Sequence, residues 1–244
     1  MTGIRYPIVE LRQYTLRPGR RDDLIGLFER ELIAPQEAAG MALLGQFRDV
    51  EDPDRFVWLR GFPDMRTRAE ALGRFYQGPV WRKHRDEANA TMIDSDNVLL
   101  LRPAGPRSGF PAPAAPRPPA GHRSAPSSLV TATICHRDRP FDEAFADFFA
   151  RQVAPALRRA GAAPLACLQT EEAENTYPAL PVRTGANVFA WFSWFDGPAG
   201  LGAHRQALAR CGDWQARIRP ALLASLGGDP QHLTLAPTPR SLLR

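Results

Sequence analysis

The sequence contains almost no lysine and few cysteines. Lys83 is the single lysine among 31 basic residues, and the arginines are scattered among acidic residues. The net charge of +5 is therefore not gathered into a basic patch, and no nucleic-acid partner is predicted. Cys135, Cys167 and Cys211 lie far apart without a C-x-x-C pair, which argues against a disulfide framework and a structural zinc site. Such thiols are typical of a reducing compartment.

The sequence also lacks a long apolar run and the common catalytic motifs. Charged residues at Arg5, Glu10 and Arg12 interrupt the N-terminal stretch, so we expect no signal peptide or membrane span and a cytoplasmic location. The G-x-S-x-G, Walker and G-x-G-x-x-G motifs are absent, which leaves serine-hydrolase and nucleotide chemistry unsupported.

The chain divides at a proline-rich segment. With 244 residues, of which 44% are hydrophobic, it is long enough for two small globular domains. Residues 103–128 carry eight prolines, which remove amide donors and forbid regular strand pairing. We predict a first unit at 1–102, a linker at 103–128 and a second unit at 129–244. The linker is expected to cross the surface without packing into it.

The two units resemble one another, which indicates a duplicated domain. Residues 32–52 parallel 152–174, and "RFVWLRGF" at 55–62 parallels "VFAWFSWF" at 188–195. Each unit then runs from a tryptophan through a helical stretch to a strand that ends at proline.

Hydrophobic periodicity gives the element order of each unit. The alternating pattern predicts strands and the three-to-four spacing predicts helices. In the first unit the predicted elements are a strand at 7–16, a helix at 19–40 interrupted near Pro35, a hairpin of strands at 41–50 and 55–62, helices at 65–76 and 80–92, and a strand at 97–103. The order β-α-β-β-α-β is the ferredoxin-like plan.

Several segments carry a family resemblance. "VELRQYTLRPG", "GQFRDVEDPDRFVWLRGF", "FYQGPVWRKHRDEANATMIDSDNVLLL" and the C-terminal "LTLAPTPRSLL" resemble the NIPSNAP family. The resemblance implies an α+β fold in which two tandem ferredoxin-like units pack sheet to sheet as a dimeric α+β barrel. It also implies a fold relationship to small monooxygenases and heme-degrading proteins, but not one particular reaction.

Strand alternation selects candidate site residues. We expect apolar residues to face the helices and the polar face to line a lumen between the two sheets. The predicted lumen residues are Glu10, Arg12, Tyr14, Gln46, Arg48, Trp58 and Arg60. Two interpretations stay open: a salt-bridged structural network, or a substrate-binding pocket in which arginines hold an anion or a carbonyl group. The same face of the second unit reads Phe189, Trp191, Ser193 and Phe195, so it is aromatic rather than charged.

Other candidates lie outside these strands. His84, on the predicted helix at 80–92, could act as a general base with Glu10, Glu87 or Asp94 as its partner, although a structural histidine is the alternative. No H-x-x-x-H spacing supports a metal site. The long loop at 174–187 carries Tyr177 and Arg183 and could form a lid over a barrel mouth, or be surface decoration.

The sequence thus predicts small-molecule handling in the lumen. The substrate would be an acidic or carbonyl-bearing metabolite, and the chemistry that of a cofactor-independent oxygenase, isomerase or cyclase. A non-catalytic ligand-binding or assembly module is the alternative. No cofactor is predicted, and a homodimer or larger assembly is expected, with association optional because each sheet face is already covered by the other unit.

Overall fold

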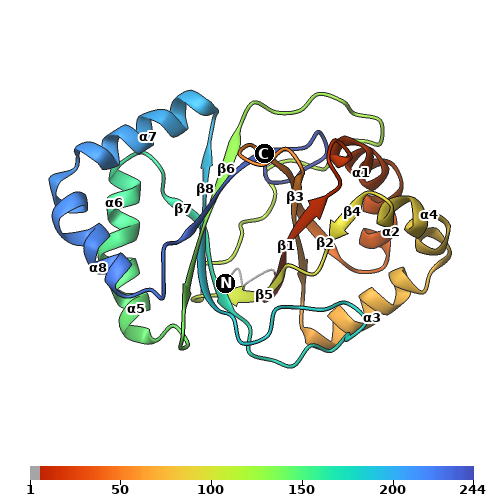
Figure 1. The fold of residues 1–244 in the computed structure, drawn as a ribbon, viewed down its shortest axis with the longest axis horizontal. Helices are drawn as coiled ribbons and strands as arrows, with labels where there is room; N and C mark the ends of the chain where they lie inside the picture. Colours follow the sequence, from red (N-terminus) through yellow and green to blue (C-terminus); the bar gives the residue numbers. More distant parts are fainter. Residues whose placement is uncertain (1–5) are drawn as a thin grey trace.

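Eight strands of the described chain close into one antiparallel barrel (Figure 1). A computed structural model describes residues 6–244, so residues 1–5 of the predicted first unit lie outside the described residues. The short strand β4 adds to one end of β1, outside the barrel ring. The strands are β1 (Ile8–Leu16), β2 (Ala42–Asp49), β3 (Arg55–Phe62), β4 (Met92–Asp94), β5 (Val98–Pro103), β6 (Leu129–Arg137), β7 (Pro164–Thr170), β8 (Asn187–Phe195) and β9 (Gln231–Pro237).

Each half of the chain supplies four neighbouring strands of the barrel. The first half has the order β5-β1-β3-β2 and the second half the order β7-β8-β6-β9. The halves join at two seams, where β2 pairs with β9 and β5 pairs with β7. Closure leaves no free edge on these eight strands, so their backbone groups are paired around the whole ring.

The helices cover the outside of the barrel in two groups (Figure 1). Helices of the first half lie on one side and helices of the second half on the opposite side. The helical segments are α1 (Arg21–Leu27), η1 (Phe28–Leu32), α2 (Ile33–Ala38), α3 (Met65–Tyr76), α4 (Pro79–Asn89), α5 (Glu143–Phe148), η2 (Phe149–Val153), α6 (Ala154–Arg159), α7 (Pro198–Arg210), η3 (Trp214–Ile218) and α8 (Arg219–Ala224). Most predicted elements of the first half are observed, and α3 has the predicted bounds. The helix predicted at 80–92 instead ends at Asn89, and Met92 begins the unpredicted strand β4.

Three helices contain a wide π turn, and each turn precedes a proline. The segments η1, η2 and η3 come before Pro35, Pro155 and Pro220. A proline ring clashes with the carbonyl four residues earlier and offers no amide hydrogen, and a π turn shifts that carbonyl away. The interruption predicted at Pro35 is therefore a local widening, and the helix continues to Ala38.

The barrel interior is apolar, which corrects the predicted lumen. Its buried side chains come from both halves and include Val9, Leu11, Leu59, Ala132 and Phe192. An eight-stranded barrel is only wide enough for side chains to fill it, so the interior favours residues that need no polar partner. The polar face of β1 and β3 points the other way, toward the helices.

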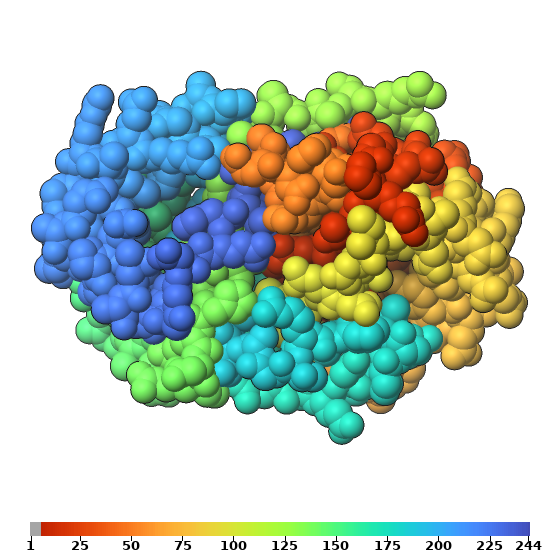
Figure 2. Space-filling model, viewed as in Figure 1, coloured from red at the N-terminus to blue at the C-terminus, as the bar shows by residue number. Residues whose placement is uncertain are grey.

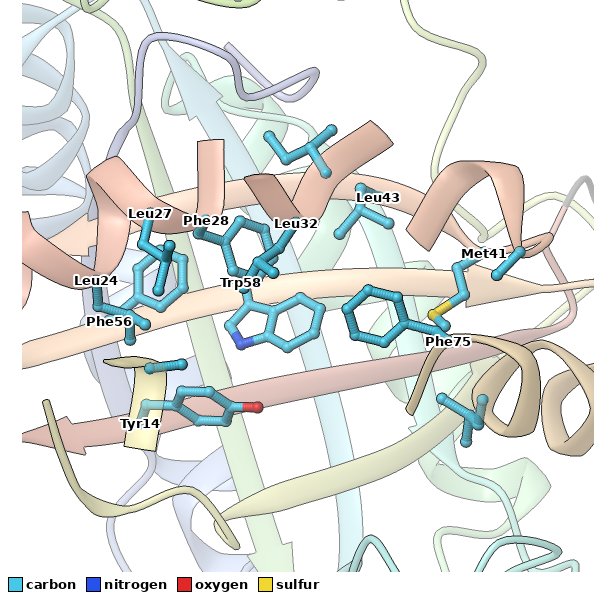
Figure 3. Close-up of a cluster of buried hydrophobic side chains, with 14 of the residues drawn as sticks. Tyr14, Leu24, Leu27, Phe28, Leu32, Met41, Leu43, Phe56, Trp58 and Phe75 are labelled. Atoms are coloured by element: carbon cyan, nitrogen blue, oxygen red, sulfur yellow. The ribbon is translucent and has the colours of Figure 1, made fainter. Parts of the chain in front are cut away.

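The layer between the first-half sheet and its helices is aromatic (Figure 3). Trp58 lies at its centre, with its ring 5.0 Å from that of Phe28 and 5.8 Å from that of Tyr14. Phe75 of α3 and Met41 lie on the other side of Trp58 in the same view. This layer, and not the barrel interior, contains the predicted residues Tyr14 and Trp58.

The proline-rich segment packs into the protein, contrary to the prediction. Phe110 is buried in the barrel core, with its ring 5.0 Å from that of Phe192. Ser108 pairs with Cys167 through a backbone bond of 2.7 Å. Farther along, Arg117 donates to Gln46 Oε1 at 3.2 Å and forms an ion pair of 2.8 Å with Glu37. The segment thus contacts both halves of the chain, and we call residues 103–128 the strap.

Candidate functional site

A single carboxylate and three arginines form a buried cluster in the first half. Glu10 Oε2 accepts from Arg12 Nη1 at 2.7 Å and from Arg60 Nε at 2.8 Å. Glu10 Oε1 accepts from Arg68 Nε at 2.7 Å. All four side chains are at most 2% exposed. We call Glu10, Arg12, Arg60 and Arg68 the charge cluster.

Strand register brings the cluster together. Glu10 is directly opposite Arg60, and Arg12 is directly opposite Trp58, in the antiparallel pair β1–β3. Directly opposed residues share one face of a sheet. The Arg12 and Arg60 guanidiniums lie 5.4 and 5.1 Å from the Trp58 ring, which gives both cations an aromatic neighbour.

Arg68 reaches the same carboxylate from α3 and was not predicted. The buried residues of α3 are Arg68, Ala71, Leu72 and Phe75, which fall at helical spacing on one face. An arginine at a core position of an amphipathic helix was the available sequence signal, because such a charge needs a buried partner.

The cluster shifts the ionisation of Glu10 and Tyr14. Burial alone would raise the pKa of Glu10, but Arg60, Arg12 and Arg68 hold that pKa well below its ordinary value of 4.5. Burial raises the pKa of Tyr14 above 10.0, although Tyr14 accepts a hydrogen bond of 3.0 Å from Arg12 Nε. Glu10 is therefore ionised and Tyr14 is neutral at pH 7.

Three of the predicted residues lie apart from this cluster. Gln46 is opposite Trp58 but contacts the strap residue Arg117. Arg48 pairs with Asp22 at 2.9 Å at the protein surface. His84 is buried on α4, with its ring nitrogens 3.6 Å from Glu87 and 3.7 Å from Glu31. His84 thus has one of its predicted partners, but it is not brought to the charge cluster.

The predicted lid is a loop of the second half that packs on the first half. It connects β7 to β8 and runs beside α3 (Figure 1). Its Tyr177 ring lies 6.3 Å from that of Tyr76 at the end of α3. Asn175 Oδ1 accepts from Arg68 Nη1 at 3.0 Å, so the loop contacts the charge cluster. Arg183 is exposed and lines a cavity beneath the loop.

An open cleft lies at the corresponding place in the second half, between the sheet and the helices. It consists of two adjoining hollows of about 340 and 310 Å³ that share Thr133, Trp191, Trp214 and His232. Figure 2 shows this face hollowed between the second-half helices and the C-terminal strand. Whereas large aromatics and arginines fill the first-half layer, space for a ligand remains in the second.

The two histidines of this cleft, His204 and His232, have lowered pKa values. His232 is exposed toward the cleft, and partial desolvation by its surroundings lowers its pKa below 6.5, as do Arg205 and Arg219. Its Nδ1 lies 3.3 Å from Thr133 Oγ1. Burial likewise lowers the pKa of His204, whose Nδ1 lies 3.0 Å from the Ala160 carbonyl oxygen. A neutral imidazole can accept a proton from a bound ligand.

Residues 6–244 contain neither a cluster of metal ligands nor a helix that could cross a membrane. No three His, Cys, Asp or Glu side chains gather there as metal ligands would. Over the same residues, no helix combines the length and apolar composition needed to cross a membrane.

Comparison with known proteins assigns the first half to a family. The NIPSNAP family model matches residues 9–106. Residues 9–106 are therefore a NIPSNAP domain. The resemblance seen in the sequence is confirmed for this span, which contains β1 from Val9 onward, β2 to β5 and the whole charge cluster.

Solved structures resemble both the NIPSNAP domain and the complete chain. A NIPSNAP family protein of Agrobacterium tumefaciens is 26% identical, with a TM-score of 0.38, covering 40% of this chain and 92% of its own. A "putative monooxygenase" of Fusobacterium nucleatum is 9% identical, with a TM-score of 0.53, covering 98% of this chain and 94% of its own. An "anthrone oxidase-like protein" is 14% identical, with a TM-score of 0.53, covering 95% and 91%. No curated protein matches the chain.

Proposed function

We propose that this NIPSNAP protein is a small-molecule oxygenase that works in the second-half cleft. The observation that carries the proposal is the position of His232, whose pKa is lowered, in an open cleft lined also by Trp191 and Trp214. Two flat indole rings favour a planar, largely apolar substrate. The full-length structural neighbours named "putative monooxygenase" and "anthrone oxidase-like" support oxygen chemistry by analogy of fold.

The proposed substrate is a planar aromatic ketone with an acidic CH₂ group that is conjugated with the carbonyl through the aromatic rings. His232 takes one proton from this CH₂, and the electron pair of the C–H bond forms an enolate. The enolate carbon then bonds to O₂, and protonation of the outer oxygen gives a hydroperoxide. Loss of water leaves a second carbonyl, so that CH₂ and O₂ become C=O and H₂O. Dioxygen is the oxidant and is consumed with the substrate.

We assign the proposed activity to the second half and a structural role to the packed layer of the first half. We interpret the halves as tandem ferredoxin-like units, because each contributes four strands in equivalent order with helices on the outer face. In the first unit, arginines and aromatic rings occupy the layer where the second unit has its cleft. Catalysis by His84 is not part of this proposal, because His84 lies on α4 of the first half and does not line the second-half cleft.

Anthrone is the probe that tests this function. Wild-type protein is expected to consume O₂ with anthrone and to form the quinone, whereas His232→Gln should lose at least about a hundredfold in kcat, the usual contribution of a general base. His122→Gln, in the proline-rich strap, is the matched control and should keep the wild-type rate.

Two results would overturn the proposal. Equal rates for wild type and His232→Gln would remove His232 as the base. Quenching of tryptophan fluorescence by anthrone without O₂ uptake would favour the non-catalytic ligand-binding alternative.

A further inference from the structure

The charge cluster carries more positive charge than its carboxylate balances. Three arginines surround Glu10, and no second carboxylate lies within ion-pair distance of Arg12, Arg60 or Arg68 among the described residues. Tyr14 does not compensate, because its raised pKa keeps the phenol neutral. The cluster therefore holds two excess positive charges at sites that are at most 2% exposed. Unpaired buried ions cost several kcal/mol each, so a bound anion would stabilise the cluster.

Two hydrogen-bond donors beside this excess charge have no partner. Arg68 Nη2 and Trp58 Nε1 are fully buried, and neither has an acceptor among the described residues. Buried donors are nearly always paired, so each unpaired donor points to an absent acceptor. Both lie in the layer that already contains the excess charge.

A cavity beneath the β7–β8 loop reaches Asn175, whose Oδ1 accepts from Arg68 Nη1. It has a volume of about 460 Å³ and is lined by Leu100, Asn175, Pro178 and Val182, among others. Leu100 is directly opposite Glu10 in the β1–β5 pair, so the cavity borders the charge cluster. Asn175 lines the cavity and also accepts from Arg68, so its amide oxygen stands where a ligand oxygen could bind.

We propose that this cavity binds an organic monocarboxylate, whose carboxylate displaces the Asn175 oxygen and engages the Arg68 fork. A guanidinium binds two carboxylate oxygens at once, which uses Nη2 as well as Nη1. The apolar tail would lie against Leu100, Pro178 and Val182. This site is separate from the second-half cleft and does not depend on the proposed oxygenase activity.

The acidic residues of the cavity wall favour a ligand with one negative charge over a ligand with two. Glu171, Glu172 and Glu174 line the same cavity, so a dianion meets repulsion that a monoanion meets less strongly. Arg183, also on the wall, offers a second cation near the opening. Sulfate and phosphate are therefore expected to bind worse than an organic monocarboxylate.

Benzoate is the probe, with benzamide as its neutral counterpart and sulfate as the dianion. Calorimetry on the wild-type protein should show saturable benzoate binding and a Tm that rises with benzoate concentration. Benzamide and sulfate should bind at least about tenfold more weakly, the loss expected for one charge-assisted hydrogen bond.

Two variants locate the site. Arg68→Gln should weaken benzoate at least about tenfold for the same reason, whereas Arg66→Gln, an exposed neighbour on α3, should leave it unchanged. Asn175→Ala should tighten benzoate binding, because the carboxylate no longer competes with the amide oxygen. This loop variant keeps the test valid if Arg68→Gln does not fold.

Three outcomes would overturn the proposal. One is equal binding of benzoate and benzamide to the wild type. Another is no saturable benzoate binding to either the wild type or Asn175→Ala. The third is benzoate binding that survives Arg68→Gln but is lost in Trp214→Ala, which would place the ligand in the second-half cleft.

Discussion

Arg60 donates a hydrogen bond to Glu10 Oε2 through Nε, and its Nη2 lies within ion-pair distance of the same oxygen. Nε lies 2.8 Å and Nη2 lies 2.7 Å from Glu10 Oε2, and neither side chain is exposed. The two residues are directly opposite in the β1–β3 pair, so the strand register itself sets this contact. Glu10 is consequently the single anion on which three buried cations depend.

Glu10→Gln is expected to destabilise the protein strongly. The substitution leaves three buried guanidiniums without an opposing charge, and breaking a buried ion pair in this way costs about 3–5 kcal/mol. Urea unfolding measures the change. Glu70→Gln, which removes an exposed partner of Arg66, is the control and should cost less than about 1 kcal/mol. A similar small loss for Glu10→Gln would show that the cluster contributes little to stability.

The stabilising effect of Glu10 should disappear in acid. Its folded-state pKa is depressed, so its contribution is fully present above the unfolded-state pKa of about 4.3 and is lost as the pH falls toward the folded-state value. The difference in urea midpoint between wild type and Glu10→Gln should therefore shrink as the pH drops below about 4. A difference that stays constant from pH 7 to pH 3 would contradict this assignment.

Phe110→Ala should destabilise the whole barrel. The Phe110 ring fills space in the barrel core beside Phe192, and truncating a buried phenylalanine costs about 3–5 kcal/mol. Pro116→Ala, at an exposed position of the same strap, should stay within about 0.5 kcal/mol of wild type. If thermal unfolding gave both variants the wild-type Tm, the strap would be dispensable, as its composition had suggested.

The pH below which the proposed activity is lost should be set by the pKa of His232. Because the pKa of His232 is lowered, kcat/KM for anthrone should fall at a more acidic pH than for a histidine with the ordinary pKa of 6.5. Removing positive charge with Arg205→Gln and Arg219→Gln together should raise the His232 pKa and move the acid limb upward. NMR titration of the His232 ring checks the pKa without relying on turnover. An unchanged ring pKa in the double variant would refute the electrostatic explanation.

Local patterns in the sequence determined much of the fold. The helical spacing of α3 and the proline near the middle of the first long helix are short-range signals, and both appear in the structure. The alternation of Glu10, Arg12 and Tyr14 with Val9 and Leu11 correctly separated the two faces of β1. Such patterns persist because backbone geometry alone sets the periods of helices and strands.

Only the tertiary structure decided which face is interior. Alternation defines two faces but does not say which one a barrel encloses, and closure at the β2–β9 and β5–β7 seams excluded the polar face from the interior. The same closure brought Arg68 and Asn175 together across 107 residues and drew Phe110 into the core. No local pattern records these contacts, because they arise when distant segments compete for the same buried space.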